Sequence, residues 1–247
     1  MILRLASYNL HKCRGLTGPH APERNLAVIA DLKADIVALQ EVDFRFGARP
    51  EALPRALIRE VTGLVPAPHL GTTALSLGWH GQTVLLRPEL AAEARLRRLP
   101  LPGIEPRGAL AVILPTLTIV AVHLGLARSS RRAQLQRLIA KATRIGGEAV
   151  VLTGDFNEWR DDRGLESLKP FTVVAPGPSW PAPFPQLRYD RIAVSPALDV
   201  TDCSVFDSAL ARRASDHLPI WADLEPAAQA GRATGASDGI PDASAFG

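Results

Sequence analysis

Ala149-Val150-Val151-Leu152-Thr153-Gly154-Asp155-Phe156-Asn157 is the stretch from which the fold can be worked out. Its first residues are apolar and rich in β-branched side chains, which predicts a strand buried on both faces. A glycine, a carboxylate and a carboxamide follow where that strand ends. A single Asp or Asn at such a place usually forms a turn. The other strand ends of the chain therefore decide whether these two side chains carry chemistry.

Other short apolar runs have the same character and are bounded by Gly, Pro or charged residues. The predicted strands are Leu3–Leu10, Ile36–Leu39, Thr83–Leu86, Leu110–Leu114, Leu117–Val122, Ala149–Leu152, Arg191–Val194 and Ile220–Leu224. Helical spacing of apolar residues predicts helices over Glu23–Lys33, Glu51–Thr62 and Ser130–Ile145. Because strands and helices do not alternate regularly, a doubly wound parallel sheet is disfavoured. We expect an α/β (α+β) fold in which two mostly antiparallel sheets pack face to face with helices outside.

The chain has 247 residues, 47% of them hydrophobic, which suffices for one large domain. We place that domain at residues 1–225. Residues 226–247 contain almost no large apolar side chain and are expected to form a disordered tail. Proline recurs through Pro176–Pro185, which therefore predicts a loop rather than a helix or a central strand.

The basic residues are mostly arginines, since only four of the 28 are lysines, which leaves 24. Arginine suits bidentate phosphate contacts, although most arginines of a protein are surface residues. The formal net charge of +3 is small for a protein that binds duplex DNA. The chain has two isolated cysteines, no leader-like start, and no apolar run near the ~18 residues that span a bilayer. We expect a cytoplasmic monomer without a membrane span.

Polar side chains recur at the ends of the predicted strands. They are Asn9, Glu41, His123, Asp155, Asn157, Asp190, Asp216 and His217. Any one of them is more often a cap or a turn former than a catalytic group. Their recurrence at the mouths of buried strands favours convergence on one site.

Glu41 is the best candidate ligand for a divalent cation, with Asn9 and Asp216 beside it. A hard cation such as Mg2+ takes oxygen ligands and keeps several waters. A zinc site is disfavoured, because the histidines show no HxH or HExxH spacing and the cysteines lie far apart. The sequence contains neither a Walker loop nor GxSxG, the motifs of nucleotide-driven work and of serine hydrolysis.

Phosphoester cleavage accounts for the remaining side chains. Asp155 is suited to act as the base that positions an attacking water, and Asn157 to hold that water or a phosphate oxygen. His217 and His123 are suited to stabilise the negative charge of the transition state.

Each of these histidines calls for a carboxylate that fixes its tautomer and raises its pKa. We expect Asp216 to act on His217 in this way, directly or through its backbone position. For His123 the candidate is Glu105, in the segment Glu105-Pro106-Arg107.

With these residues in view, the chain resembles the endonuclease/exonuclease/phosphatase superfamily, the deoxyribonuclease-I-like fold, over roughly residues 1–225. The segments that carry the resemblance are Ser7-Tyr8-Asn9-Leu10, Leu39-Gln40-Glu41, Glu105-Pro106-Arg107, Ala121-Val122-His123-Leu124, Gly154-Asp155-Phe156-Asn157, Tyr189-Asp190-Arg191-Ile192 and Ser215-Asp216-His217-Leu218-Pro219. Each segment is weak alone, and together in this order they are specific.

The resemblance implies a four-layer α/β/β/α sandwich and a phosphoesterase that depends on Mg2+ or Mn2+. By position it makes Glu41 the main metal ligand, with Asn9 and Asp216 beside it. It assigns binding of the phosphate to Asn157 and contact with the scissile phosphate to His217.

The resemblance also implies roles for three further strand-end residues. Asp155 would orient the attacking water, and His123 would lie near the leaving group. Asp190, which precedes the penultimate strand, would support His217 or the leaving group.

Within the superfamily the chain is most similar to small bacterial members whose substrates are mostly unassigned. They share Asn-x-His-Lys near the start, here Asn9-Leu10-His11-Lys12, and Gly-Asp-Phe-Asn-Glu-Trp. His11, Lys12 and Arg45 are candidates to line the phosphate pocket, and the equally good alternative is that they are solvated loop residues. Gly81-Gln82-Thr83 stands where many relatives have Gly-Asn-Ala, so no substrate contact is inferred there.

We therefore predict a divalent-metal-dependent hydrolase that cleaves phosphoester bonds, phosphodiesters in particular, by attack of an activated water. Its substrate would be a small molecule, a lipid headgroup or a nucleic acid. The alternative is a DNA endonuclease or exonuclease of the abasic-site-repair type. An aromatic content of 5% and the lack of a basic tract weaken that alternative. A catalytically silent binding module is less favoured, because Glu41, Asp155 and His217 are all retained.

Overall fold

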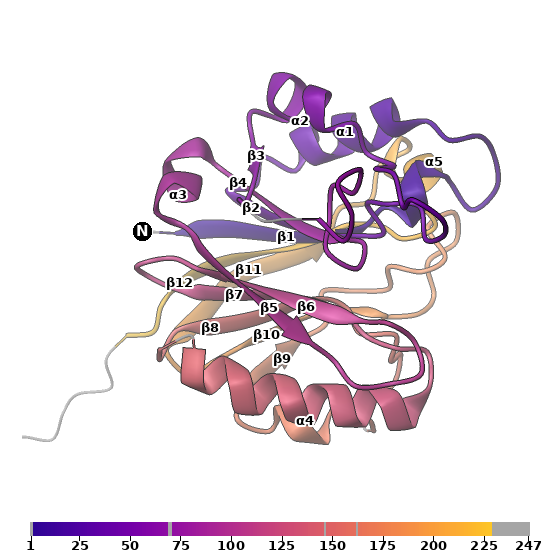
Figure 1. The fold of residues 1–247 in the computed structure, drawn as a ribbon. Helices are drawn as coiled ribbons and strands as arrows, with labels where there is room; N and C mark the ends of the chain where they lie inside the picture. Colours follow the sequence, from indigo (N-terminus) through magenta and orange to yellow (C-terminus); the bar gives the residue numbers. More distant parts are fainter. Residues whose placement is uncertain (1, 69–70, 146, 162, 229–247) are drawn as a thin grey trace, which may run out of the picture.

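Two six-stranded sheets pack face to face in the computed structural model, which describes residues 2–68, 71–145, 147–161 and 163–228 (Figure 1). Across the first sheet the strands are, in order, β11 (Leu198–Val205), β12 (Ile220–Pro226), β1 (Leu3–Asn9), β2 (Ile36–Gln40), β4 (Gln82–Leu86) and β3 (Val65–Pro66). Across the second they are β5 (Arg95–Pro100), β6 (Gly108–Ile113), β7 (Thr118–His123), β8 (Val150–Asp155), β10 (Asp190–Val194) and β9 (Thr172–Val174).

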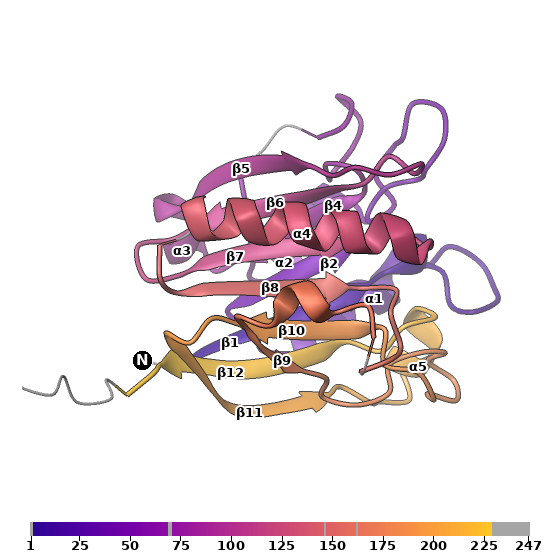
Figure 2. The ribbon, with the colours of Figure 1, turned by 90° about the horizontal axis from the view of Figure 1, so that it is seen from below.

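Helices cover the outer face of each sheet, as Figures 1 and 2 show. The first sheet is covered by α1 (Pro22–Asp31), α2 (Arg55–Thr62), α5 (Ala211–Ala214) and the short 3-10 helix η1 (His11–Cys13). The second is covered by α4 (Arg128–Ile145) and η2 (Glu166–Leu168), and α3 (Pro88–Glu93) lies beside β3 and β4. The predicted four-layer α/β/β/α sandwich is confirmed. None of the described helices is long and apolar enough to cross a membrane.

Three apolar cores hold the four layers together, because the interior strands are buried on both faces. In β8, Val151 points between the sheets, whereas Val150 and Leu152 point toward α4. In β2, Ile36 points between the sheets and Val37 points toward the outer helices. This alternation follows the two-residue period of a strand. Burial on both faces explains why these strands read as continuous apolar runs in the sequence.

Each sheet contains one parallel strand pair among antiparallel neighbours. β1 runs parallel to β2, and β7 runs parallel to β8. Asn9 therefore lies beside Gln40 at the end of the parallel pair in the first sheet, and His123 lies beside Asp155 at the end of the parallel pair in the second. The Asn9 side chain donates a hydrogen bond to Asp155 across the two sheets. β10 is antiparallel to β8 and sets Asp190 opposite Asp155. The prediction of mostly antiparallel sheets is confirmed, and the two parallel pairs bring the polar strand ends together.

The boundary of one predicted helix is wrong. The helix expected over Glu51–Thr62 begins only at Arg55. Glu51 instead pairs with Asp43 in an isolated bridge, and Pro54 precedes the helix with extended backbone. Proline disfavours the helical conformation in the residue before it, which keeps the segment from 51 to 53 out of the helix.

Four strands were not predicted from the sequence: β3, β5, β9 and β11. They are the edge strands, two in each sheet. β12 ends at Pro226, and the Ala227 N–H donates to the Ala197 carbonyl at 2.9 Å. Residues 229–247, most of the expected tail, lie outside the described residues. The loop predicted over Pro176–Pro185 contains no helix or ladder strand, and only an isolated bridge joins Trp180 to Leu187.

At Gly154 the backbone of β8 leaves no room for a side chain beside β7. Its φ of +147° is a conformation that side chains rarely allow, and a Cβ atom there would lie 1.9 Å from the Val122 carbonyl oxygen. The glycine of the Gly-Asp-Phe-Asn segment is therefore required by the packing of the two parallel strands that carry His123 and Asp155.

We expect Gly154→Ala to lower the free energy of unfolding by about 3 kcal/mol or more, because strain and a backbone clash act together. Gly18→Ala is the matched control, since Gly18 has φ of +125° but a Cβ atom there would meet no other atom within 4 Å. Urea unfolding followed by circular dichroism measures both variants. Equal losses of stability in the two would show that the close approach to Val122 does not matter.

Candidate active site

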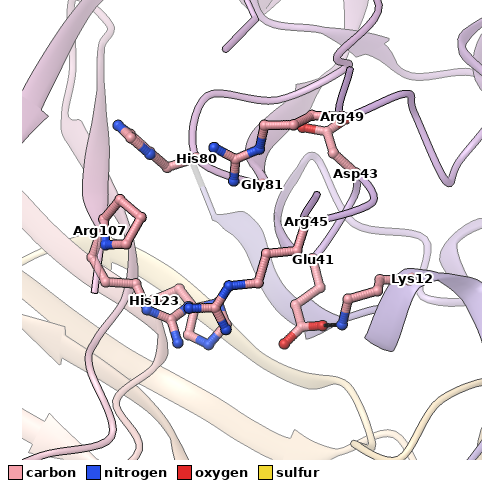
Figure 3. Close-up of a pocket in the computed structure, with 10 residues that line it drawn as sticks. Lys12, Glu41, Asp43, Arg45, Arg49, His80, Gly81, Arg107 and His123 are labelled. Atoms are coloured by element: carbon pink, nitrogen blue, oxygen red, sulfur yellow. Dashed lines mark hydrogen bonds and ion pairs between the residues drawn. The ribbon is translucent and has the colours of Figure 1, made fainter. Parts of the chain in front are cut away.

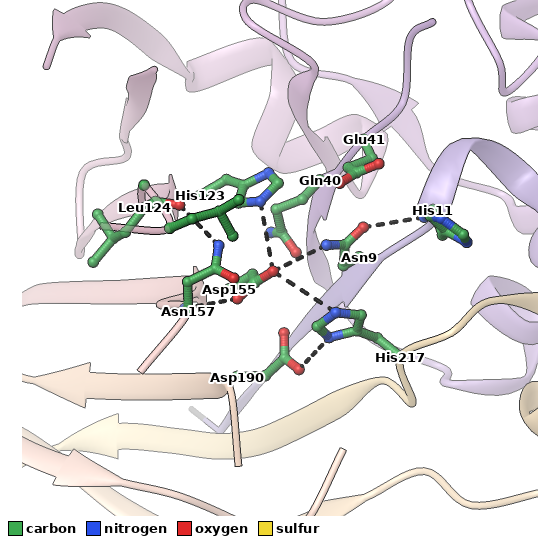
Figure 4. A network of polar contacts seen from close by, with 12 residues as sticks. Asn9, His11, Gln40, Glu41, His123, Leu124, Asp155, Asn157, Asp190 and His217 are labelled. Atoms are coloured by element: carbon green, nitrogen blue, oxygen red, sulfur yellow. Dashed lines mark hydrogen bonds and ion pairs between the residues drawn. The ribbon is translucent and has the colours of Figure 1, made fainter. Parts of the chain in front are cut away.

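The carboxylate of Asp155 lies at the centre of a polar network between the two sheets (Figure 4). Its Oδ2 accepts a hydrogen bond from Asn9 Nδ2 at 3.1 Å and lies 3.5 Å from His123 Nε2 and 3.8 Å from His217 Nε2. Its Oδ1 accepts the backbone N–H of Asn157 at 2.8 Å. The structure thus brings together five of the residues predicted from the strand ends.

Burial raises the pKa of Asp155 to about 6, and the nearby charge of Asp190 acts in the same direction. The imidazolium of His217 and the hydrogen bonds from Asn157 and Asn9 lower the pKa and limit that rise. A carboxylate whose pKa lies near neutrality can be ionised in the resting site and still accept a proton, which suits a general base.

His217 is held by Asp190. Burial alone would lower its pKa, but His217 Nδ1 lies 2.8 Å from Asp190 Oδ2, and that carboxylate raises the pKa of His217 to about 10. Asp190 in turn accepts a hydrogen bond from Ser179 Oγ at 2.5 Å. His217 is therefore an imidazolium at neutral pH. The carboxylate in contact with this histidine is Asp190, which the resemblance had offered as its support, and not Asp216, because β10 is paired with β8 and delivers Asp190. Asp216 acts only as a more distant charge that also raises the pKa of His217.

His123 is neutral, in contrast to His217. Burial lowers its pKa to about 3, and the Arg107 guanidinium adds to that shift. The expected partner, Glu105, faces elsewhere: it forms ion pairs with Arg107 at 2.8 Å and Arg45 at 3.4 Å. The carboxylate nearest to His123 is that of Asp155, which reaches it through the β7–β8 pairing.

Glu41 forms an ion pair with Lys12 at the mouth of the site. Burial opposes ionisation of this carboxyl, but His123, Lys12 and His11 together lower the pKa of Glu41 to about 2. His123 contributes only when protonated, so at neutral pH Lys12 is the cation that keeps Glu41 ionised. Lys12 therefore already neutralises the carboxylate that was predicted to bind the metal.

The other two candidate ligands, Asn9 and Asp216, both lie next to His11. The Asn9 Oδ1 atom accepts the backbone N–H of His11 at 3.0 Å, and Ser215 Oγ donates to the Asn9 carbonyl at 2.6 Å. Asp216 Oδ1 lies 3.7 Å from His11 Nδ1, and Trp180 Nε1 donates to Asp216 Oδ2 at 3.3 Å. His11 is thus tied to the site by its backbone and its ring.

Left-handed backbone is concentrated around this site. Among the described residues other than glycine, eight have positive φ. Lys33 and Cys13 lie away from the site, Cys13 with its side chain in the apolar core under the outer helices. The other six, with φ between 46° and 57°, are His11, Lys12, Glu41, Arg49, His80 and Asn157. Such conformations cost free energy and persist where the surrounding structure enforces them. Here they turn the side chains at the strand ends toward a common space.

The donor set fits a hard cation and does not fit a closed zinc site. Glu41 lines a cavity together with Lys12, His123 and Arg107 (Figure 3). In the part of the chain that the structure describes, no three His, Cys, Asp or Glu side chains come together as a metal cluster. Mg2+ is often bound through one or two carboxylates, waters and substrate phosphates. Glu41 is a carboxylate of the kind that could hold such a cation, whereas Asn9 and Asp216, the other candidate oxygen donors, do not line the same cavity.

The structure adds contacts that the sequence prediction had not assigned to the site. Ser179 binds Asp190, and the ring of Tyr189 lies 6.3 Å from that of His217. Tyr189 directly precedes Asp190, and Ser179 lies in the proline-rich segment Pro176–Pro185 that was predicted as a loop, so these positions were the available signal. Gln82, for which no substrate contact was inferred, is fully buried and donates its amide to the Gly108 carbonyl.

Comparisons with known proteins agree with this geometry. The uncharacterised protein YbhP of Escherichia coli K12 is 33% identical over 162 residues, which are 60% of this chain and 63% of YbhP, so the chain spans less than two thirds of that relative. An endonuclease/exonuclease/phosphatase from Beutenbergia cavernae superposes with a TM-score of 0.67 at 22% identity, covering 91% of this chain and 72% of that one. TDP2 of D. rerio, complexed with a single-strand DNA product, superposes with a TM-score of 0.66 at 17% identity, covering 91% and 99%.

These structural likenesses establish the fold, and the family follows from the sequence itself. The profile of the Endonuclease/Exonuclease/phosphatase family matches residues 6–217, a span that contains every strand-end residue discussed above. The members of that family are phosphoesterases and nucleases. The chain belongs to the endonuclease/exonuclease/phosphatase family.

Proposed function

We propose that this protein is a divalent-metal-dependent phosphodiesterase that cleaves a P–O bond by attack of water. One observation carries the proposal: a buried carboxylate that titrates near neutrality, Asp155, lies 3.8 Å from an imidazolium, His217. A base and a fixed positive charge therefore face the same space, which suits in-line displacement at a phosphate. Glu41, which lines a cavity together with His123, supplies a negative ligand for a cation.

In the proposed reaction, Asp155 orients a water whose oxygen forms a bond to phosphorus while its proton passes to the carboxylate. The bond to the leaving oxygen breaks, and that oxygen takes up a proton from solvent. His217 stabilises the negative charge on the phosphoryl oxygens, and Asn157 is fixed for a phosphate contact by its Nδ2 hydrogen bond to the Leu124 carbonyl at 2.8 Å. A bound Mg2+ or Mn2+, held by Glu41 with Asn9 and Asp216, would add Lewis-acid stabilisation of the same charge.

A nuclease of the abasic-site-repair type is the second candidate. Trp159 follows the Gly-Asp-Phe-Asn-Glu segment with 47% of its surface exposed, and the Arg160 guanidinium lies 4.7 Å from its ring. An exposed aromatic ring beside a guanidinium is a platform on which a nucleic-acid base can stack. This single platform favours a nuclease less strongly than the site chemistry favours phosphodiester cleavage in general.

Metal dependence is tested with bis-p-nitrophenyl phosphate. We expect EDTA and Glu41→Gln each to lower turnover by about a hundredfold or more, because both remove cation-based stabilisation of the transition state. Added Mg2+ or Mn2+ should restore the EDTA-treated wild type but not the variant. Glu89→Gln, on the exposed surface of α3, is the matched control and should leave turnover unchanged. Turnover insensitive to both EDTA and Glu41→Gln would rule the proposal out.

The positioning role of Asp190 is tested by Asp190→Asn. With the carboxylate gone, burial dominates, so the pKa of His217 should fall from about 10 toward its ordinary 6.5 or below. NMR titration of the metal-free protein measures this shift, and kcat should drop by about a hundredfold at neutral pH. Ser179→Ala keeps the carboxylate and should shift the pKa much less. An unchanged His217 titration in Asp190→Asn would remove Asp190 from this role.

The nuclease candidate is tested by plasmid nicking beside a panel of small and lipid phosphodiesters. We expect weak nicking relative to hydrolysis of the small esters, since the formal net charge is only +3 and the aromatic content is 5%. Nicking at a rate typical of a dedicated nuclease, with a tenfold or greater loss on Trp159→Ala, would instead establish the second candidate.

A further inference from the structure

The cavity beside Glu41 extends to a basic wall that the proposed reaction does not use. Its lining includes Arg45, Arg49, His80 and Arg107, which we call the basic wall (Figure 3). Arg45 and Arg49 come from the loop that follows β2, His80 from the segment that precedes β4, and Arg107 from the turn that precedes β6. Asp155 and His217, the groups proposed to act on the scissile phosphate, do not line this cavity.

Two members of the basic wall have buried nitrogen atoms without a partner. Arg49 Nε and His80 Nδ1 form no hydrogen bond with any residue that the structure describes. Nor does the Arg49 guanidinium form an ion pair within that part of the chain, although it lies close enough to lower the pKa of His80. Buried polar groups are normally satisfied. Arg49 Nε–H is a donor, and His80 Nδ1 donates in the tautomer that carries its proton there, so together they suit a ligand that accepts hydrogen bonds.

The remaining charges of the cavity are already compensated. Lys12 is paired with Glu41, and Glu105 is paired with both Arg45 and Arg107. Arg49 forms no ion pair with a described residue. The Asp43 carboxylate lines the same cavity and lies near enough for the Arg49 charge to lower its pKa, but it is already occupied by the backbone N–H groups of Leu77 and Gly78. The guanidinium of Arg49 is therefore available to an anion. The cavity lining is otherwise polar, with Pro106 as its one apolar side chain, so it suits a compact anion such as phosphate better than an apolar chain or a base.

The loops that present Arg49 and His80 are held in place before any ligand arrives. The Asp43 carboxylate accepts the backbone N–H groups of Leu77 at 2.7 Å and Gly78 at 3.0 Å, which joins the loop after β2 to the segment before β4. Ser76 Oγ donates to the Arg49 carbonyl at 2.8 Å. A preorganised cationic wall loses little freedom on binding, which favours affinity.

We propose that Arg49 and His80 bind a second phosphate group of the substrate, so that the enzyme acts on phosphodiesters that also carry a phosphate monoester. This inference rests on the proposed function, because Glu41 and His123 line the same cavity as the basic wall. The scissile phosphate lies toward Asp155, and the second phosphate lies toward Arg49. Charge-assisted hydrogen bonds from a guanidinium supply the recognition.

Matched substrate pairs test the proposal. One series consists of p-nitrophenyl ω-phosphoalkyl phosphates with spacers of two to four carbons, and the other carries a hydroxyl in place of the terminal phosphate. We expect at least one spacer at which the terminal phosphate raises kcat/KM by about tenfold or more, the size of one charge-assisted hydrogen bond. No preference for the phosphate at any spacer, while the hydroxyl esters are hydrolysed, would overturn the inference and leave the proposed function intact.

Variants locate the effect. Arg49→Gln should reduce the preference for the terminal phosphate to less than about threefold, whereas Arg49→Lys should retain part of it because the charge remains. Arg59→Gln, on the exposed face of α2, is the matched control and should keep the full preference. A preference that survives Arg49→Gln would also overturn the inference.

Binding of inorganic phosphate to the EDTA-treated protein tests the basic wall without catalysis. Isothermal titration should give at least about tenfold weaker binding for Arg49→Gln than for the wild type and for Arg59→Gln. If the hydroxyl esters are not hydrolysed at all, the proposed function fails, and this titration still decides the inference. Equal phosphate affinity in all three proteins, or no binding in any, would contradict a phosphate site at Arg49.

Discussion

A carboxylate that is buried between two sheets needs hydrogen-bond donors or positive charges around it. Asp155, with 2% of its surface exposed, is such a carboxylate, and the other side chains of the site surround it. Its neighbours come from both sheets: Asn9 from β1 in the first, His123 and His217 from the second sheet and the turn before β12. The Asn9 amide therefore spans the space between the sheets to reach it. The apolar core between the sheets sets their relative position, and the Asn9–Asp155 contact joins the site across them.

The two histidines of the site differ in protonation state because their neighbours differ. His217 has Asp190 at 2.8 Å and is positively charged at neutral pH, whereas His123 has Arg107 as its strongest charged influence and is neutral. Burial acts on both in the same direction, so the neighbouring charges decide the difference. A fixed cation and a neutral hydrogen-bond donor on either side of Asp155 are suited to a phosphate whose charge increases during reaction.

Charge is also divided between the two ends of the cavity beside Glu41. Near the strand ends the carboxylate of Glu41 dominates and is matched by Lys12. Farther along, the basic wall carries guanidinium groups: Arg45 and Arg107 form ion pairs with Glu105, whereas Arg49 forms none with a described residue. A cation and an anion can therefore bind in neighbouring positions without competing, which is the arrangement that a metal-dependent enzyme with a multiply charged substrate requires.

The sequence by itself determined the eight interior strands, because burial on both faces leaves a continuous apolar run that needs no knowledge of partners. It also determined which polar residues stand at the strand ends, since Asn9, Glu41, His123 and Asp155 directly follow such runs. The four edge strands could not be predicted from the sequence, because they lack a continuous apolar run. β5, for example, is largely exposed and rich in arginine, as strands at a sheet edge can be. Only the tertiary structure decided which carboxylate meets which histidine and that Arg49 and His80 share a cavity. Those contacts join residues far apart in the chain through strand order and loop ties, and no local pattern of residues encodes them.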